Sequence, residues 1–416
     1  MNVTIIGGGA AGLMAAAALL EIEPAARSTI IDRNDALGKK VVISGGGRCN
    51  VTTGLLDVKT VLTKYPRGSK FLSSAMHRFT PQAVATWFET HGVPLKTEED
   101  LRVFPVSDNG RDVVKVFETL FHESAARVLL KTPVLRVEKS GRQFLATLKG
   151  VAEPLISDKL VLTTGGQAYR HTGSTGDGYA FAASLGHSIT QLAPSLNAFF
   201  TQETWPSEVA GLSFSRAKLT AKVNPSRAFT GPFLFTHKGI SGPAVFALSS
   251  LVAFENYSAV APLPITIDLL PDSSAAELQR QAEAHIATNP KKNWANTLAT
   301  LVPKSLVEIL LNELRQPGER HAVEVGKKEV ARALAWLKAV PLHVVGRGAG
   351  DEFVTAGGVS LKEVNPSTME SRLCPGLYFA GEILDIDGYT GGFNLQASWA
   401  TGHLVGESIA ATMPKA

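Results

Sequence analysis

The stretch Val3-Thr4-Ile5-Ile6-Gly7-Gly8-Gly9-Ala10-Ala11-Gly12 decides the fold. Its first four residues predict a buried strand, and the apolar, Ala-rich residues 13–20 after it predict a helix packed on a sheet. Gly7, Gly9 and Gly12 match G-x-G-x-x-G between these elements, the context that a dinucleotide-binding motif needs. Gly7 makes the turn, Gly9 lets a pyrophosphate approach the backbone, and Gly12 lets the helix pack against the strand. The stretch therefore predicts a Rossmann-like α/β domain.

An acidic residue stands where this fold binds a ribose. A second strand, Thr29-Ile30-Ile31, ends at Asp32, about 20 residues past the glycines, where an acid bonds a ribose 2′-OH. Asp32 favours FAD or NAD over NADP. The helix N-terminus offers unpaired N–H groups and a positive dipole end to the phosphates. A merely structural glycine turn explains less, because strand, glycines, helix and acid agree.

Composition indicates a folded protein of more than one domain. At 416 residues the chain is too long for one ordinary core, so two or three domains are expected. Hydrophobic residues make up 44% and charged residues 19%, and no apolar run is long enough for a transmembrane helix. Cys49 and Cys374 give no disulfide framework, so a reducing cytoplasm is expected. The net charge of +4 permits an anionic partner without requiring one, and we predict no metal site.

A second glycine-rich loop follows Lys39 and Lys40: Ser44-Gly45-Gly46-Gly47-Arg48-Cys49-Asn50. A run of glycines lets backbone N–H groups converge on an anion or a planar ring. Arg48 adds a charged fork and Asn50 an amide. We interpret this loop as a cofactor or substrate loop; a tight structural turn is the alternative.

The C-terminal part repeats the physics of the opening. The apolar strand Gly376-Leu377-Tyr378-Phe379-Ala380-Gly381-Glu382 delivers a carboxylate that can bond ribityl hydroxyls. Gly391-Gly392 then opens a small-residue helix, beginning Phe393-Asn394-Leu395-Gln396, whose N-terminus can face a flavin carbonyl or a phosphate. A further turn, Thr164-Gly165-Gly166, closes an earlier apolar strand. A cofactor held between both ends of the chain must be long, and FAD is long enough.

The middle of the chain differs from both ends. Short alternating stretches and recurring prolines predict a mainly β domain over residues 190–274, and helical spacing predicts helices over 275–340. The helical part carries ten Lys or Arg against seven Glu, and its basic residues either meet phosphates or form a solvated face. The basic residues in question are Lys291, Lys292, Lys327, Lys328 and Arg332.

With these motifs assembled, the chain resembles the BaiN/RdsA family of NAD(P)/FAD-dependent oxidoreductases, also called the YhiN-like flavoproteins. The motifs that carry the resemblance span nearly the whole chain. They are Gly7 to Gly12, Ser44 to Asn50, Phe235-Thr-His-Lys-Gly-Ile-Ser-Gly-Pro243, Thr355-Ala-Gly-Gly-Val359, Gly376 to Glu382 and Gly391 to Gln396. Two departures are Thr53, where Asn is usual, and Phe393, where Tyr is usual.

The resemblance implies a three-domain architecture of the fumarate-reductase/glutathione-reductase type. A discontinuous Rossmann-like FAD-binding domain would comprise residues 1–189 and 341–416, with a β-barrel-like domain (190–274) and an α-helical domain (275–340) inserted. The loop from Ser44 to Asn50 would lie along the isoalloxazine. Members of the family are linked to reduction of a ribosomal RNA uridine to dihydrouridine, and to redox chemistry on steroid-like enones.

Both activities deliver hydride from reduced flavin to a polarised C=C, followed by protonation of the α carbon. His237 suits general acid work, although a loop histidine bonded to backbone is the plainer interpretation. Cys49 is a second candidate, because a thiol among N–H groups beside Arg48 should have a lowered pKa. Arg48 or Asn50 could polarise the substrate carbonyl.

Three functions stay open from the sequence: an enzyme that reduces uridine in ribosomal RNA, a small-molecule enone or steroid-type reductase or dehydrogenase, and a flavin-containing binding or assembly protein. The RNA enzyme predicts that the basic residues of the helical part form one face beside the flavin cleft, and that this cleft is wide and open because a nucleotide must be splayed out to reach the ring. The small-molecule enzyme predicts an enclosed apolar pocket. No second complete G-x-G-x-x-G is visible, so NAD(P)H is expected as a transient reductant. The predicted FAD contacts are Gly7, Gly9, Ala10, Ala11, Gly12, Asp32, Arg33, Lys40, Ser44, Gly45, Gly46, Gly47, Arg48, Cys49, Asn50, Val134, Thr164, Gly165, Gly166, Gly381, Glu382, Gly391, Gly392, Phe393, Asn394 and Leu395.

Overall fold

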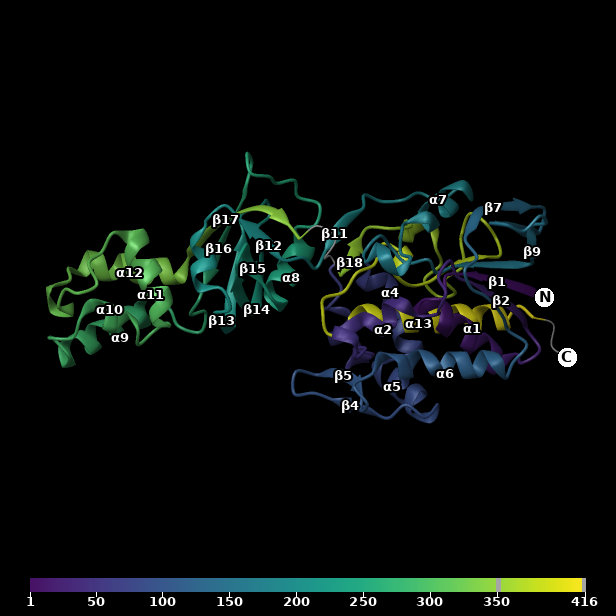
Figure 1. Ribbon diagram of the computed structural model, residues 1–416, viewed down its shortest axis with the longest axis horizontal. Helices are drawn as coiled ribbons and strands as arrows, with labels where there is room; N and C mark the ends of the chain where they lie inside the picture. Colours follow the sequence, from purple (N-terminus) through teal and green to yellow (C-terminus); the bar gives the residue numbers. More distant parts are fainter. Residues whose placement is uncertain (349–352, 414–416) are drawn as a thin grey trace. The chain divides into compact units, whose positions relative to one another are not determined.

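The computed structural model describes residues 1–348 and 353–413 (Figure 1). The chain divides into two compact units. Unit 1 comprises Met1–Ser195 and Gly350–Ala416, and unit 2 comprises Leu196–Ala349. No helix in the described ranges is both long enough and apolar enough to cross a membrane.

A parallel sheet lies at the centre of unit 1, in the order β19-β10-β1-β2-β6. The opening strand β1 pairs with β10 on one side and with β2 on the other, and β19 near the C-terminus pairs with β10. Both ends of the chain therefore share one sheet, and the prediction of a Rossmann-like α/β fold is confirmed. These strands are Asn2–Ile6 (β1), Arg27–Ile31 (β2), Arg127–Leu129 (β6), Lys159–Leu162 (β10) and Leu377–Phe379 (β19).

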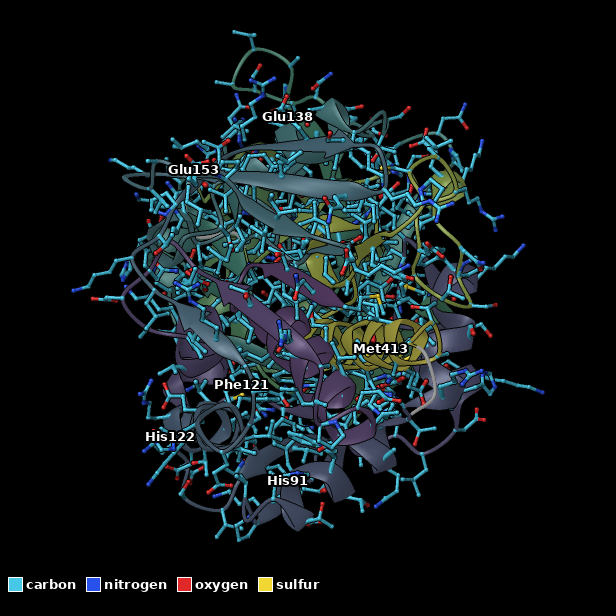
Figure 2. All side chains as sticks on the ribbon, turned by 90° about the vertical axis from the view of Figure 1, so that its right-hand side faces the viewer. His91, Phe121, His122, Glu138, Glu153 and Met413 are labelled. Atoms are coloured by element: carbon cyan, nitrogen blue, oxygen red, sulfur yellow. The ribbon has the colours of Figure 1, made fainter. Side chains whose placement is uncertain are left out.

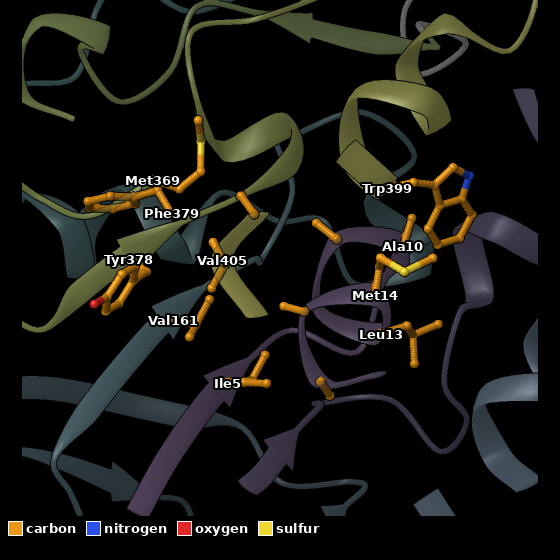
Figure 3. Close-up of a cluster of buried hydrophobic side chains, with 14 of the residues drawn as sticks. Ile5, Ala10, Leu13, Met14, Val161, Met369, Tyr378, Phe379, Trp399 and Val405 are labelled. Atoms are coloured by element: carbon orange, nitrogen blue, oxygen red, sulfur yellow. The ribbon is translucent and has the colours of Figure 1, made fainter. Parts of the chain in front are cut away.

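Two helices pack against each other over this sheet: α1 (Ala10–Ile22) and α13 (Phe393–Ala410). Small residues allow the close approach, because a Cβ added to Gly402 would lie 2.4 Å from the Ala11 carbonyl oxygen. Residues 10–20 of α1 are all buried, which explains why this helix is apolar on every side. Figure 3 shows Leu13 and Met14 of α1 and Trp399 of α13 in the resulting core.

The remaining elements of unit 1 surround the central sheet. Figure 2 shows Glu138, in the antiparallel sheet β7-β8-β9, on one side of the parallel strands, and His91 and His122, at the ends of α5 and α6, on the other. The helices are Lys39–Ile43 (α2), Val58–Leu62 (α3), Ser69–Arg78 (α4), Pro81–Thr90 (α5), Gly110–His122 (α6) and Asp177–Ser184 (α7), with short 3-10 turns at Ser44–Gly47 (η1) and Gly381–Ile383 (η6). The strands are Thr52–Thr53 (β3), Leu95–Thr97 (β4), Arg102–Pro105 (β5), Val134–Ser140 (β7), Gln143–Leu148 (β8), Leu155–Ser157 (β9), Ala193–Ser195 (β11) and Val354–Ala356 (β18).

A closed barrel in the order β12-β15-β14-β13-β16-β17 forms one part of unit 2. Its interior is filled by Phe199, Phe233, Phe235 and other buried side chains. The predicted boundary after residue 340 falls at the start of β17, which pairs with β12 and β16 and is therefore a barrel strand. The strands are Phe199–Thr201 (β12), Ser213–Ala221 (β13), Arg227–Thr236 (β14), Gly239–Ser241 (β15), Leu263–Asp268 (β16) and Val340–Arg347 (β17).

Helices make up the other part of unit 2. α8 lies against the barrel strand β14, and α9 to α12 pack mainly on one another (Figure 1). Leu306 and Leu310 of α11 are fully buried, as their spacing predicts. The helices are Pro243–Leu251 (α8), Ala275–Thr288 (α9), Trp294–Leu298 (α10), Lys304–Leu314 (α11) and Lys327–Lys338 (α12), with a 3-10 turn at Ala322–Glu324 (η4).

Candidate functional site: a nucleotide site in unit 1

The glycines of the first loop differ in what surrounds them. A Cβ added to Gly7 would lie 2.4 Å from the Thr163 carbonyl oxygen, and one added to Gly12 would lie 2.0 Å from the Gly7 carbonyl oxygen. The protein's own packing therefore requires glycine at both positions. Around a Cβ on Gly9, by contrast, no described atom lies within 4 Å, and the Gly9 φ of −85° suits any residue. Open space thus lies beside Gly9, at the start of α1.

The N-terminus of α1 borders this space, and a second helix, α13, begins elsewhere in unit 1 with a similar N-terminus. Gly9 precedes α1 and Gly392 precedes α13, and within the described chain neither helix has a side-chain cap. The first N–H groups of both helices are therefore available to a ligand, and helix N-termini favour anionic groups. A Cβ added to Gly381, in η6, would lie 2.8 Å from the Ala11 Cβ, so the η6 turn after β19 contacts the first residues of α1.

Asp32 lies at the end of β2, where an acid was predicted. Its Oδ2 accepts a hydrogen bond from the Gly8 N–H, and its Oδ1 accepts one from the Asn34 N–H, both at 2.8 Å. Each oxygen keeps a further lone pair for a hydroxyl. The N–H of Thr132 donates to the Asp32 carbonyl at 3.0 Å, which brings the segment leading to Val134 beside Asp32.

Arg33, the next predicted contact, interacts with a loop and helix of the protein. Its Nη1 donates to the Thr175 Oγ1 at 2.5 Å and to the Asp177 Oδ2 at 2.7 Å. Its side chain is 38% exposed. Arg33 therefore links β2 to the start of α7 at the surface.

Glu382 joins three distant segments. Its Oε2 accepts from the Lys40 ammonium at 2.7 Å, and its Oε1 accepts from the Thr355 N–H at 2.9 Å. A Cβ on Gly166 would lie 3.0 Å from Oε1, so the Thr164-Gly165-Gly166 turn crosses the carboxylate closely. Lys40 and Glu382 are both partly buried, with 27% and 16% of their side chains exposed. The structure thus brings these predicted residues together, although they are 342 positions apart.

The neighbouring turn contains a hydroxyl with no partner. Thr164 Oγ1 is buried and makes no hydrogen bond with any described residue. Such a group costs free energy unless a water or a ligand satisfies it. It lies next to Gly165, whose φ of +71° needs glycine.

The loop from Ser44 to Asn50 is built on left-handed backbone. Gly45, Gly46 and Gly47 have φ of +57°, +73° and +88°, and a Cβ on either of the last two would meet no described atom within 4 Å. The Ser44 carbonyl accepts from the Cys49 N–H at 2.9 Å and closes the turn. Gly46 and Gly47 thus face open space, as the interpretation of a ligand loop requires.

The side chains of this loop are occupied by the protein itself. Arg48 ion-pairs with Glu98 and with Asp108 Oδ1 (2.8 Å for the second), and its guanidinium stacks 3.8 Å from the centre of the Phe104 ring. The hydrogen bonds that the guanidinium donates to Glu98 and Asp108 raise the Arg48 pKa. The Asn50 Oδ1 accepts from the Val103 N–H at 3.2 Å. Sequence reasoning missed Glu98, Phe104 and Asp108, because they lie 50 to 60 residues away and carry no motif.

The expectation of a lowered pKa at Cys49 is wrong. Its thiol is fully buried, and the loss of solvent raises the Cys49 pKa to about 12. A hydrogen bond with Ser44 opposes this only in part. The error came from placing the thiol among N–H groups, whereas the left-handed φ of +61° at Cys49 accompanies a side chain buried against α6, next to Gly110.

The start of α13 is held in place by its own residues. Asn394 Oδ1 accepts from the Gly388 N–H and its Nδ2 donates to the Gly388 carbonyl, both at 2.8 Å. The Tyr65 hydroxyl donates to the Phe393 carbonyl at 2.6 Å, and Phe393 is buried while Leu395 is half-buried. A Cβ on Gly392 would lie 2.3 Å from the Thr52 carbonyl, whereas the φ of +118° at Gly391 is what requires glycine there.

His237 belongs to unit 2. It lies in the turn between β14 and β15 and its side chain is exposed. The Lys238 carbonyl of the same turn accepts from the Thr201 N–H at 3.0 Å, which fixes the turn to β12.

The comparisons with known proteins agree with this geometry. The family described as "HI0933-like protein Rossmann domain" matches residues 1–408. The chain belongs to this family. It is 29% identical to the 3-dehydro-bile acid delta(4,6)-reductase of Clostridium scindens, over 98% of this chain and 99% of that protein. It is 30% identical to the ribosomal RNA dihydrouridine synthase of Escherichia coli, over 95% of each.

A solved structure supports the same fold for this HI0933-like chain. The 3-ketosteroid delta1-dehydrogenase of Sterolibacterium denitrificans superposes with a TM-score of 0.53 at 12% identity, covering 99% of both chains. The full-length relatives are named for redox reactions, and this HI0933-like protein is an oxidoreductase.

Proposed function

We propose that the chain binds FAD in unit 1 and reduces a carbon–carbon double bond conjugated to a carbonyl, with a uracil ring of ribosomal RNA as the substrate. The open space beside Gly9, at an N-terminus of α1 without a side-chain cap, is the observation that carries the cofactor. The RNA substrate is supported by the names of the Escherichia coli and Haemophilus influenzae relatives.

Different residues of unit 1 would bind different parts of FAD. The N–H groups that begin α1 would hold the pyrophosphate, and Asp32 would accept from the ribose hydroxyls. Lys40 and Glu382 would keep the Gly165-Gly166 turn and the η6 turn at the spacing that the ribityl chain needs. When bound, the flavin supplies hydride transfer to the β carbon of the substrate.

The proton for the α carbon of the substrate would come from a side chain of the protein. Cys49 is unsuited to this task, because its thiol is buried and its pKa is raised to about 12. His237 is exposed on unit 2 and is of the residue type most used in general acid catalysis, and its role as the proton donor stays a prediction. NAD(P)H would dock transiently to reduce the flavin, since the sequence holds no second complete G-x-G-x-x-G.

A second function is favoured by one relative. The Clostridium scindens protein is named as a reductase of a bile-acid derivative, and its similarity covers as much of this chain as that of the RNA enzymes. A small-molecule enone would accept hydride from the flavin in the same way as a uracil ring. The cofactor site alone therefore does not distinguish the two substrates.

Two measurements separate them. The protein, reduced anaerobically, should be reoxidised rapidly by a uridine-bearing fragment of ribosomal RNA and not by free enones. Mass mapping should show a dihydrouridine in ribosomal RNA that disappears when the gene is deleted. Identical maps with and without the gene would refute the RNA substrate, and reoxidation by enones alone would establish the second function. Slow reduction by NADH and NADPH with no acceptor would indicate a flavin-containing binding protein.

A further inference from the structure

A cavity of about 220 Å³ lies within unit 2, between α9 and the segment that begins with α10. Figure 1 shows these two helices side by side. The cavity is smaller than the pockets of roughly 300–1,000 Å³ that enclose drug-sized ligands, and it matches a single planar ring. It is lined by Gln281, Ala282, His285, Trp294, Thr297, Leu298, Thr300 and Leu301.

The walls of this cavity combine flat rings with polar groups. Trp294 is only 1% exposed, and its Nε1 donates to the Gln316 Oε1 at 3.0 Å, so the fixed indole closes the cavity and offers no open face for stacking. The ring that a flat ligand can stack on is His285 of α9, which is partly exposed. Gln281 and Thr300 are exposed at the cavity and carry an amide and a hydroxyl. Such a lining suits a flat, polar heterocycle better than an aliphatic chain.

Positive charge adjoins the cavity. The Lys292 ammonium lies 3.5 Å from the His285 Nε2, and Lys291 next to it is exposed. Both lysines are held by a neighbouring segment: the Lys292 carbonyl accepts from the Ala322 N–H, and His321 Nδ1 contacts the Lys291 carbonyl, each at 2.8 Å. Arg320, in the same segment, ion-pairs with Glu329 and so neutralises a nearby carboxylate. Lys291 and Lys292 therefore provide two positive charges on this part of unit 2, against the exposed carboxylate of Glu283 on α9.

We propose that this cavity binds one unpaired nucleobase of the RNA substrate, a different nucleotide from the one reduced, while Lys291 and Lys292 contact its flanking phosphates. Unpaired bases splayed onto aromatic side chains are the usual target of RNA recognition by proteins. Stacking of one base should strengthen RNA binding about tenfold, and each phosphate contact adds salt dependence. The assignment rests on the proposed function, because it takes RNA as the substrate.

The test measures RNA binding by the full-length protein. The probe is a short fluorescein-labelled single-stranded RNA rich in uridine, titrated at several salt concentrations, and its abasic analogue is titrated in parallel. The double change Lys291→Ala/Lys292→Ala should weaken binding of both probes and reduce the salt slope by about 1.4, at about 0.7 per phosphate. Gln281→Trp or Thr300→Trp, each filling the cavity from an exposed position, should weaken binding of the RNA about tenfold and leave the abasic probe unaffected.

The matched control is Lys218→Ala, which removes an exposed lysine of β13 in the barrel and should change neither value. Wild-type binding by the cavity-filling variants, or an equal loss on both probes, would overturn the assignment. Flavin reoxidation by the same RNA separates this result from the proposed function. If the wild-type protein is reoxidised by RNA while every variant binds normally, only the cavity assignment fails. If RNA binds as described and reoxidises nothing, only the proposed function fails.

Discussion

The two glycine-rich loops of unit 1 look alike in sequence and differ in how they use their residues. In residues 7–12, two glycines are required by packing and the third, Gly9, faces open space. In residues 44–50, glycines are required by their positive φ, and Arg48, Cys49 and Asn50 are all engaged by the protein. The first loop offers a ligand its main chain beside a helix end, and the second offers the backbone at Gly46 and Gly47.

The comparison shows that side chains beside a run of glycines are not automatically catalytic. Arg48, Cys49 and Asn50 carry the functional groups of a reaction site, yet each stabilises the loop instead. In the proposed function, hydride would come from the bound flavin and the proton from a residue outside this loop.

Gly12→Ala should be the most damaging change. Its methyl would lie 2.0 Å from the Gly7 carbonyl oxygen, and the Gly7 N–H is itself fixed to the Ile31 carbonyl at 2.9 Å, so neither can move freely. We expect the free energy of unfolding to fall by about 3 kcal/mol. Denaturant titration of the apoprotein measures it; a loss within experimental error would show that α1 packs less closely than described.

Lys40→Met should lower stability by roughly 1–2 kcal/mol, because it leaves the partly buried Glu382 without its cationic partner. Flavin affinity should fall with it, since Glu382 orders the turns of the proposed site. The control is Lys39→Met, whose partner Asp35 is 59% exposed, and this change should cost less than about 0.5 kcal/mol. Equal effects of the two changes on stability and on flavin binding would remove Lys40 from the site.

Arg48→Gln should act on stability and not on catalysis. The change breaks the ion pairs with Glu98 and Asp108, so the melting temperature should drop modestly, and the drop should shrink at high salt. Turnover at saturating substrate should stay at the wild-type value. A large loss of kcat with an unchanged melting temperature would instead mean that Arg48 polarises the substrate.

Cys49 should show almost no reactivity. Its pKa is raised to about 12 by burial, so the thiol stays protonated in the native protein throughout pH 7–9. Because the folded-state pKa of Cys49 lies above the ordinary value of 9.0, the contribution of Cys49 to the free energy of unfolding should be constant below pH 9. This contribution should decline as the pH rises from 9 towards 12. The rate at which a thiol reagent labels Cys49 in the native protein, compared with the rate in the unfolded protein, measures this difference in reactivity. Rapid labelling of Cys49 in the native protein would make the thiol a catalytic candidate again. A shift in the pH profile of activity in Cys49→Ser would do the same.

The fold was predictable because its signals are local. The strand, the three glycines, the Ala-rich helix and Asp32 stand in one stretch, and the C-terminal strand and helix repeat the pattern. The barrel strand β17 was assigned to the wrong side of the predicted boundary, because nothing in residues 340–347 distinguishes a barrel strand from a strand of the returning domain.

The backbone geometry of the glycine loops was predictable from the sequence, and the contacts of their side chains were not. The spacing of Gly7, Gly9 and Gly12 sets backbone geometry directly, so the pattern and the structure correspond. The environment of Arg48 depends on Glu98, Phe104 and Asp108, which reach it through tertiary packing. The burial of Cys49 likewise depends on α6 packing over the loop, and a single sequence carries no local sign of it.

Gly9→Ala tests the central claim most directly, that a nucleotide cofactor fills the space beside α1. The methyl would meet no described atom within 4 Å and the backbone suits alanine, so the apoprotein should unfold within about 0.5 kcal/mol of wild type. FAD binding, followed by flavin fluorescence, should be weakened at least tenfold in the same sample. Normal FAD binding by this variant, or a wild-type protein that takes up no FAD, would contradict the account.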